Sequence, residues 1–233
     1  MTSAQQHQRI ATAARQGRLQ ARPAPPTARA ALGTQALGLD ATKDALLYLP
    51  AGYQPAEPAP LAVMCHGAGG KADHGLNILQ YLADETGLIL LAPASRSRTW
   101  DMLMDDYGPD IALLDEALAA TFARCTVDPE RIAIGGFSDG ASYALSVGIM
   151  NGDLFSHILA FSPGFMAPLI QRDTPAIFIS HGIEDGVLPI NRCSRQIVPQ
   201  LMEAGYEVRY QEFDDRIRCR RILREAVMWF VGG

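Results

Sequence analysis

The sequence contains few cysteines, and their positions do not suggest a metal site. Cys65, Cys125, Cys193 and Cys219 are far apart, so no C-x-x-C pair or similar ligand spacing occurs. Each cysteine falls in or beside a segment that we expect to be regular secondary structure. Buried, reduced thiols are therefore the favoured interpretation.

Long uninterrupted runs of one charge and long apolar runs are also missing. The net charge is −5 and no run of Lys or Arg occurs, so we do not expect a nucleic-acid partner. No apolar run is long enough to span a bilayer, and residues 1–20 contain no apolar core of a signal peptide. We expect a cytoplasmic protein without a membrane span, and the oligomeric state stays open.

What the chain does have is enough apolar sequence for one compact α/β domain. Its 233 residues are 48% hydrophobic. Residues 1–26 are polar, Ala-rich and then Pro-rich, which indicates a partly ordered lead-in, and residues 27–233 are expected to form the single domain. From residue 44 onward, short apolar runs alternate with segments of helical period, a pattern typical of a largely parallel, doubly wound sheet.

The apolar runs predict a sheet of about 7–8 strands with helices between them. Strands are expected at Ala45–Leu49, Leu61–Cys65, Leu88–Ala92, Arg131–Gly135, His157–Phe161, Ala176–Ser180 and Val208–Phe213, with a possible edge strand at Gly17–Arg22. Helices are expected at Leu76–Glu85, Asp110–Arg124, Ser138–Met150, Asn191–Ala204 and Arg220–Phe230.

A G-x-S-x-G motif follows one of these strands and precedes a helix. It reads Gly136-Phe137-Ser138-Asp139-Gly140. In this context the serine sits on a sharp turn, and small residues two positions before and after it let the strand and helix approach closely. Ser138 is therefore the candidate nucleophile. The alternative is a Gly-rich turn with an exposed structural serine.

The loop His66-Gly67-Ala68-Gly69-Gly70 follows another strand and is suited to an oxyanion hole. Its backbone N–H groups, at Gly67 and Ala68, can turn toward a developing oxyanion together with the N–H of Asp139. We interpret His66 as structural. Residues 67–72 also fit G-x-G-x-x-A of a dinucleotide site, but no acidic residue ends the next strand, so dinucleotide binding is the less favoured alternative.

An acid follows the strand Ala176–Ser180. Asp185 is our first choice for the acid that orients a catalytic histidine, and Glu184 is the second. The alternative is that Asp185 merely forms an Asx turn before Gly186.

Together, the segments at residues 61–70, 136–140, 160–164 and 181–185 resemble the phospholipase/carboxylesterase family of α/β-hydrolases, over about residues 44–214. The resemblance implies an α/β-hydrolase fold without a large lid. It also implies hydrolysis of carboxylic esters or thioesters through an acyl-enzyme on Ser138, with no metal or organic cofactor. Trp100, Asp101, Phe165 and Leu188 could line an open substrate pocket or pack in the core.

The resemblance breaks down at the catalytic histidine. In that family the last strand leads into a Gly-rich loop that carries this residue, whereas here Val208–Phe213 leads into Asp214–Arg221, and no histidine follows His181. Serine needs a positioned base, and arginine cannot act as one at neutral pH. The chain has five histidines, and none of them is assigned as the base. They are His7, His66, His74, His157 and His181.

Three explanations remain open for the missing base. Another histidine serves, the chain has lost hydrolytic power, or Asp214–Arg221 is scrambled by a compensated frame change in the DNA. We favour the last two jointly. A non-catalytic binding protein with the hydrolase fold is the alternative function.

Overall fold

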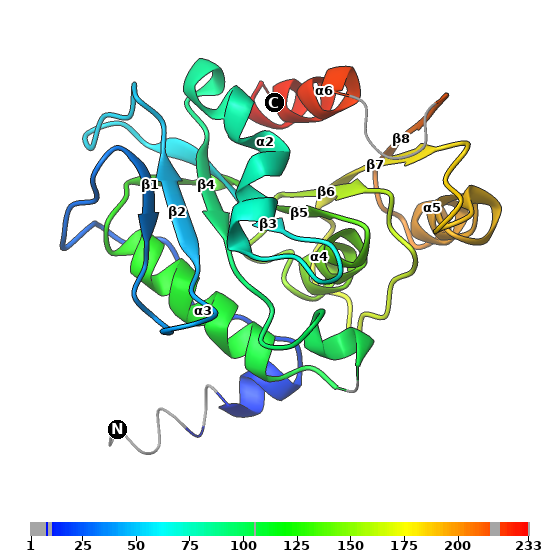
Figure 1. Cartoon of the computed structure of the whole chain (residues 1–233), viewed down its shortest axis with the longest axis horizontal. Coiled ribbons are helices and arrows are strands. Elements are labelled where there is room, and N and C mark those ends of the chain that lie inside the picture. The colour runs from blue at the N-terminus through cyan, green and yellow to red at the C-terminus, as the bar shows by residue number, and fades with distance from the viewer. Residues whose placement is uncertain (1–7, 9–10, 105, 215–219, 233) are drawn as a thin grey trace.

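The computed structural model describes residues 8, 11–104, 106–214 and 220–232, which are built around one eight-stranded sheet. The strands are β1 (Gly33–Ala36), β2 (Leu46–Leu49), β3 (Ala59–Cys65), β4 (Ile89–Ala92), β5 (Val127–Phe137), β6 (His157–Phe161), β7 (Ala176–Gly182) and β8 (Val208–Phe213). Their order across the sheet is β1-β2-β4-β3-β5-β6-β7-β8 (Figure 1). Strand β2 runs antiparallel to both neighbours, and the remaining pairs are parallel. The predicted mostly parallel sheet is confirmed.

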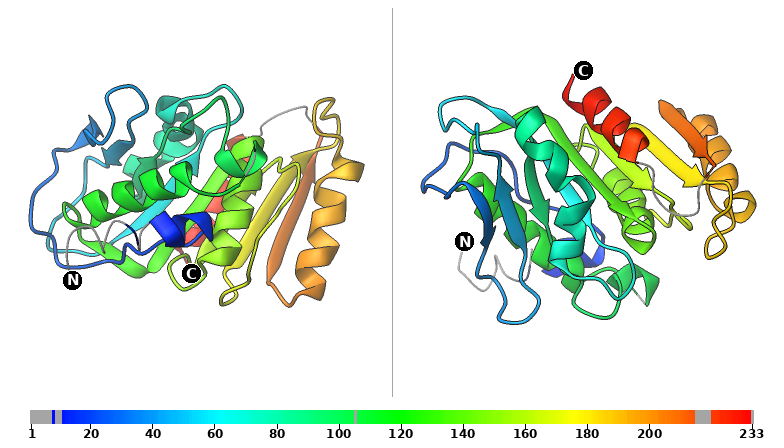
Figure 2. Two further views of the ribbon diagram at one scale, coloured as in Figure 1. Left: turned by 90° about the horizontal axis from the view of Figure 1, so that it is seen from below. Right: turned by 45° about the horizontal axis from the view of Figure 1, so that its top comes forward.

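Helices cover both faces of the sheet (Figures 1 and 2). The described helices are α2 (Ala72–Thr86), α3 (Pro109–Phe122), α4 (Asp139–Met150), α5 (Ser194–Glu203) and α6 (Arg220–Val231), with short 3₁₀ helices at Asp101–Leu103 and Ile190–Arg192. Helices α3, α4 and α5 contribute to one apolar layer, and α2 and α6 contribute to the other. The fold is therefore doubly wound, as predicted.

The side chains of strand β3 contribute to both apolar layers. Leu61, Val63 and Cys65 belong to the layer that contains α3 and α4, whereas Ala62 and Met64 belong to the layer that contains α2 and α6. Alternate side chains of a strand point to opposite faces, and both faces of this sheet are covered. A continuous apolar run is the consequence.

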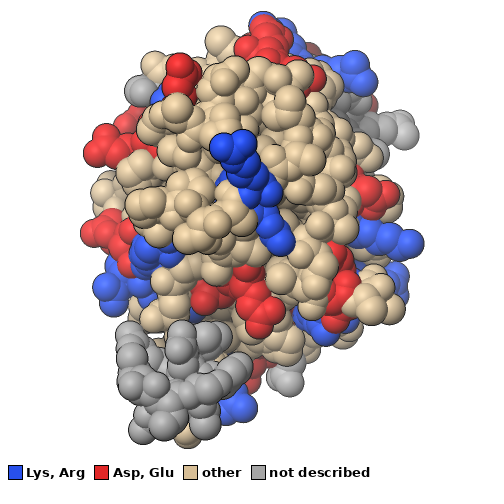
Figure 3. Space-filling model, turned by 90° about the vertical axis from the view of Figure 1, so that its left-hand side faces the viewer, with Lys and Arg blue, Asp and Glu red and all other residues tan. Residues whose placement is uncertain are grey.

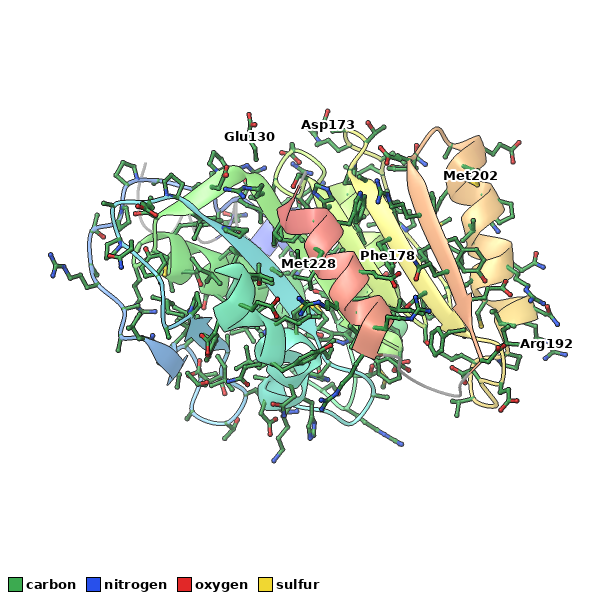
Figure 4. All side chains as sticks on the ribbon, turned by 90° about the horizontal axis from the view of Figure 1, so that it is seen from above. Glu130, Asp173, Phe178, Arg192, Met202 and Met228 are labelled. Atoms are coloured by element: carbon green, nitrogen blue, oxygen red, sulfur yellow. The ribbon has the colours of Figure 1, made fainter. Side chains whose placement is uncertain are left out.

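Helix α6 closes the second layer at the C-terminal end of the chain. Figure 4 shows it crossing the sheet beside Phe178 of β7. The rings of Phe178 and Trp229 are 6.0 Å apart, and Phe230 is completely buried. The predicted closing helix is thus present after residues 215–219, which lie outside the described residues.

The expected edge strand at Gly17–Arg22 is wrong. The N–H of Leu19 donates to the side chain of Asn151 at 2.9 Å, and the next two N–H groups donate to Oδ1 of Asp115. The edge of the sheet is instead β1, which the sequence analysis missed. Ala14 and Leu19 are buried in the core, so residues 14–21 pack against the domain.

No helix of the described residues combines the length and apolar character needed to cross a membrane.

Candidate active site

The sheet brings the candidate loops together at the carboxyl ends of its parallel strands, where ligands of such sheets bind. Ser138 follows the central strand β5. The Gly67 loop follows the neighbouring β3, and Asp185 lies beyond the end of β7. The strand order therefore puts the oxyanion loop and the acid on opposite sides of Ser138.

Ser138 occupies a strained turn. Its φ is 57° and its ψ is −121°, a backbone conformation that residues with a Cβ rarely adopt. The turn is held because the N–H of Ser138 donates to the carbonyl of Phe161 at 3.0 Å, and its own carbonyl accepts the N–H groups of Ala141 and Ser142. The strain lifts the serine out of the strand and onto the N-terminus of α4.

The two glycines of the motif are required by close backbone contacts. A Cβ on Gly140 would lie 2.2 Å from the carbonyl oxygen of Cys65, and one on Gly136 would lie 2.5 Å from the backbone of Gly140. Real Cβ atoms do not approach so closely. The motif therefore reflects the tight packing of β3, β5 and α4, as the sequence analysis expected.

The candidate oxyanion loop adjoins Ser138. A Cβ on Gly67 would lie 3.5 Å from the Cβ of Ser138. Hydrogen bonds from Gly70 to Gly67 and from Gly69 to the carbonyl of Arg98 keep the loop turned. On the other side, Asp139 is the first residue of α4, where a backbone N–H has no acceptor within the helix.

His66 supports this loop from beneath, which confirms its structural interpretation. The side chain is completely buried. Its Nδ1 lies 2.7 Å from the carbonyl of Gly67, and its Nε2 accepts the N–H of Ser95 at 3.0 Å. Burial lowers the pKa of His66, so the ring is neutral and its partners fix which nitrogen carries the proton.

The acid loop is organised by Asp185. Its Oδ1 accepts the N–H groups of Val187 and Leu188, each at 2.9 Å, which is an Asx turn. Its Oδ2 lies 3.5 Å from Nε2 of His181. The Asx turn is therefore present, whereas the role of Asp185 as an orienting acid stays a prediction, and Glu184 is exposed to solvent.

Comparison with solved structures identifies this architecture. A thermostable esterase superposes with a TM-score of 0.67 at 21% identity, covering 85% of this chain and 62% of the other. Esterase PE8 gives 0.63 at 23% identity, covering 78% and 97%. Esterase 2 of Thermogutta terrifontis, with propionate bound, gives 0.64 at 17% identity, covering 90% and 96%. The chain has the α/β-hydrolase fold.

Sequence comparisons point to similar proteins. The profile of the phospholipase/carboxylesterase family matches residues 109–216 of this hydrolase-fold chain, so the resemblance is confirmed there. The protein named "Probable feruloyl esterase C" of Aspergillus clavatus is 26% identical over 157 residues, which is 64% of this chain and 57% of the relative. The alignment thus spans little more than half of that relative. These comparisons support the expected class of carboxylesterase-type hydrolase.

The histidines of this hydrolase fold do not supply a base in the described part of the chain. His181 is completely buried, with Nδ1 at 2.7 Å from Oγ of Ser194 and Nε2 at 2.8 Å from the carbonyl of Leu188. His74 accepts the N–H of Lys71 at the start of α2, and His157 begins β6 at the opposite end of the sheet. His7 lies outside the described residues.

The segment after β8 begins at the right place for a catalytic histidine. The carbonyl of Phe213, at the end of β8, accepts the N–H of Ile183 in the acid loop at 2.9 Å. Residues 215–219 lie outside the described residues, so Asp214 is the last residue described before α6. Within the described ranges, no hydrogen bond joins another side chain to the hydroxyl of Ser138.

Trp100 does not line an open pocket. It is completely buried, donates its indole N–H to the carbonyl of His66 at 2.9 Å and stacks on Tyr143 with ring centroids 4.5 Å apart. Of the alternatives weighed from the sequence, packing in the core is the correct one for this residue. Phe165, by contrast, is 40% exposed at the carboxyl edge.

A half-buried and a buried carboxylate, Asp101 and Asp110, hold the loop before α3, and the sequence analysis missed this pairing. Oδ2 of Asp101 accepts the N–H groups of Gly108 and Asp110, at 2.8 and 2.9 Å. Asp110 in turn accepts the N–H groups of Asp101 and Arg96. Burial and the neighbouring Asp101 raise the pKa of Asp110 to about 7. The sequence offered no signal for this pairing, because it depends on where the loop folds back onto the start of α3.

The same loop reaches the residue after the nucleophile. The hydroxyl of Thr99 donates to Oδ2 of Asp139 at 2.7 Å. The carboxylate pair therefore stabilises a loop that contacts the N-terminus of α4. No three His, Cys, Asp or Glu side chains of the described residues gather as metal ligands would.

Proposed function

We propose that this protein hydrolyses carboxylic esters or thioesters through an acyl-enzyme on Ser138. The strained turn that presents Ser138 between the Gly67 loop and the N-terminus of α4 carries this proposal. Such turns are found where a nucleophile must stand clear of its strand. The resemblance to a family of esterases supports the same reaction.

The proposed reaction needs a nucleophile, an oxyanion hole and a base. The hydroxyl oxygen of Ser138 attacks the acyl carbon, and the N–H groups of Gly67, Ala68 and Asp139 donate to the oxyanion. The alcohol or thiol leaves with a proton, and water then releases the acid from Ser138. Asp185 is proposed to orient the histidine that transfers these protons.

We further propose that this histidine is encoded out of frame. Residues 216–221 read Arg-Ile-Arg-Cys-Arg-Arg. An arginine codon CGC followed by any isoleucine codon contains CAT, a histidine codon, across the boundary between Arg216 and Ile217. In the same shifted frame the next codon ends in CG, as does the codon that spans Cys219 and Arg220. A base encoded there would follow β8 in the sequence, as the resemblance leads us to expect.

Two measurements test the proposal. Sequencing the coding DNA should reveal CAT across the codons of Arg216 and Ile217, with a frame change before it and a compensating change after it. Labelling by a fluorophosphonate probe and hydrolysis of p-nitrophenyl acetate are then measured for the original chain and for its Ser138→Ala variant. A frame-corrected protein that is neither labelled nor active beyond Ser138→Ala would refute the esterase proposal.

The substrate is proposed only as a class. One curated relative is named a feruloyl esterase, so a feruloyl ester belongs in the substrate panel beside short aliphatic esters. A panel in which the frame-corrected protein prefers the feruloyl ester would favour an aromatic acyl group.

A non-catalytic binding function is the second candidate. It is favoured by the engagement of both ring nitrogens of His181 and of His66, which leaves neither free to accept the proton of Ser138. It predicts that an ester raises the melting temperature without turnover. Dinucleotide binding has less support because Gly67 is turned toward Ser138, and a melting temperature unchanged by NAD would exclude it.

A further inference from the structure

A cavity opens at the end of the sheet opposite to Ser138. It lies beside the residues that precede β3 and β5, whereas Ser138 follows β5. Its volume is about 480 Å³. The lining residues come from three segments and are Pro26, Ala28, Arg29, Ala30, Leu32, Tyr53, Pro55, Arg124 and Thr126.

Hydrogen bonds tie the walls of this cavity together. The N–H of Thr126 donates to the hydroxyl of Tyr53 at 2.8 Å, and the hydroxyl of Thr126 donates to the carbonyl of Pro55 at 2.6 Å. The N–H groups of Thr27 and Ala28 both donate to the carbonyl of Ala123 at 2.9 Å. The cavity is therefore built before any ligand arrives, which lowers the entropic cost of binding.

The charge within the cavity is positive. Arg29 and Arg124 contribute to the lining, and no acidic residue does. Neither arginine forms an ion pair with a carboxylate of the described residues. The Nη1 atom of Arg124 is buried and has no hydrogen-bond partner in the described ranges. A buried donor without an acceptor is costly, so Arg124 gains hydrogen-bonding free energy if its side chain turns toward an acceptor in the cavity.

The surface at this side of the molecule is largely uncharged. Residues 26–32 lie at the β1 side of the fold in Figure 1, and that side faces the viewer in Figure 3. Figure 3 shows basic side-chain atoms in the middle of a broad area without charged residues, with acidic side chains toward its margins. Leu32, which lines the cavity, is 57% exposed. An exposed leucine and two arginines are thus combined at the cavity.

We propose that this cavity binds a small organic carboxylate with an apolar body. The N–H groups of a guanidinium match the two oxygens of a carboxylate, and two arginines are available. The alanine, proline and leucine side chains of the lining would contact the hydrocarbon part. The volume lies within the range of small-molecule sites, roughly 300–1,000 Å³. This site is independent of the ester-hydrolysing role proposed for Ser138.

Calorimetric titration with octanoate, octanamide and acetate tests the two parts of the proposal. Octanoate should bind more tightly than octanamide, which lacks the charge, and more tightly than acetate, which lacks the apolar body. Equal affinity for octanoate and octanamide would overturn the role of the arginines. The Ser138→Ala variant should bind octanoate as the parent does, because Ser138 is at the other end of the sheet.

Variants locate the site. Arg29→Gln and Arg124→Gln should each weaken octanoate binding by about tenfold or more, the typical loss of a charged hydrogen bond. Arg192→Gln is the matched control, since Arg192 is exposed at the far end of the molecule beside α5 (Figure 4). If Arg124→Gln unfolds, the exposed Arg29 decides the outcome. Unchanged binding in Arg29→Gln, or an equal loss in Arg192→Gln, would refute the assignment.

Discussion

At the carboxyl ends of the strands, the conformation around Ser138 is fixed by backbone contacts. The conformation around Asp185, by contrast, depends on side-chain contacts. Around Ser138, backbones approach so closely that Gly136 and Gly140 cannot carry a Cβ. Around Asp185, one carboxylate holds the turn, and a Cβ on the neighbouring Gly186 would meet nothing within 4 Å. Packing constrains the first side much more than the second.

This difference explains how a base can be absent while the fold persists. Strand β8 still pairs with β7 up to Gly182 and Phe213, and α6 still packs against the sheet through Phe230. A change in the coding of the segment between β8 and α6, as proposed above, is therefore compatible with an intact sheet.

Restoring the shifted reading frame across residues 215–221 should have the largest effect. A histidine after β8 would give Ser138 its general base, and loss of a triad member costs several orders of magnitude in rate. We expect kcat/KM for p-nitrophenyl acetate to rise by roughly a thousandfold or more. The measurement is steady-state ester hydrolysis by the corrected and the original chains.

The control for this experiment is Ser138→Ala in the corrected chain. It should return the rate to the level of the original chain. The corrected chain could stay inactive although its circular dichroism matches that of the original chain. In that case Ser138, Asp185 and the restored histidine do not form a triad.

Gly140→Ala should destabilise the protein by about 3 kcal/mol or more, because its Cβ cannot be accommodated without a backbone shift. Gly186→Ala, on the acid side, should change stability by less than about 0.5 kcal/mol. Both glycines have negative φ, so the comparison isolates the contact with the carbonyl of Cys65. Urea unfolding measures both. Similar losses would show that the two sides are equally constrained.

Features fixed by packing could be predicted from the sequence, whereas features fixed by single polar contacts could not. The run Leu61–Cys65 is apolar because both faces of β3 are covered, so its strand was evident. Strand β1, Gly33–Ala36, alternates between half-buried and exposed residues and gave no apolar signal. The prediction began helix α2 at Leu76, whereas the helix begins at Ala72. The first turn was missed because its residues are mostly polar or small.

The candidate site follows the same rule. Gly136 and Gly140 marked the nucleophile because a close approach demands glycine. The pairing of Asp101 with Asp110 was not evident, because it depends on where the loop folds back onto the start of α3. No pattern of residue types encodes that contact.

Titration of Asp110 tests the loop that contacts Asp139, the residue after the proposed nucleophile. Its pKa is 3.8 when unperturbed and about 7 in the fold, so the native state binds more protons between these values. The contribution of Asp110 to stability should therefore fall as pH rises from about 4 to 7, by on the order of 2 kcal/mol. The measurement is the difference in unfolding free energy between the protein and Asp110→Asn across this pH range. A difference that is independent of pH would contradict the raised pKa.

Asp185 should give the smallest effect on stability and the clearest division between its two roles. Asp185→Ala removes the acceptor for the N–H groups of Val187 and Leu188 and should cost about 1 kcal/mol. Asp185→Asn retains an oxygen acceptor and should cost less than about 0.5 kcal/mol. In the frame-corrected chain, however, the asparagine should lower kcat as strongly as the alanine, because an amide cannot stabilise a charged histidine. Equal stability losses for the two variants would mean that charge, and not the Asx turn, holds the acid loop. A kcat that falls only in the alanine variant would mean that Asp185 shapes this loop without orienting the base.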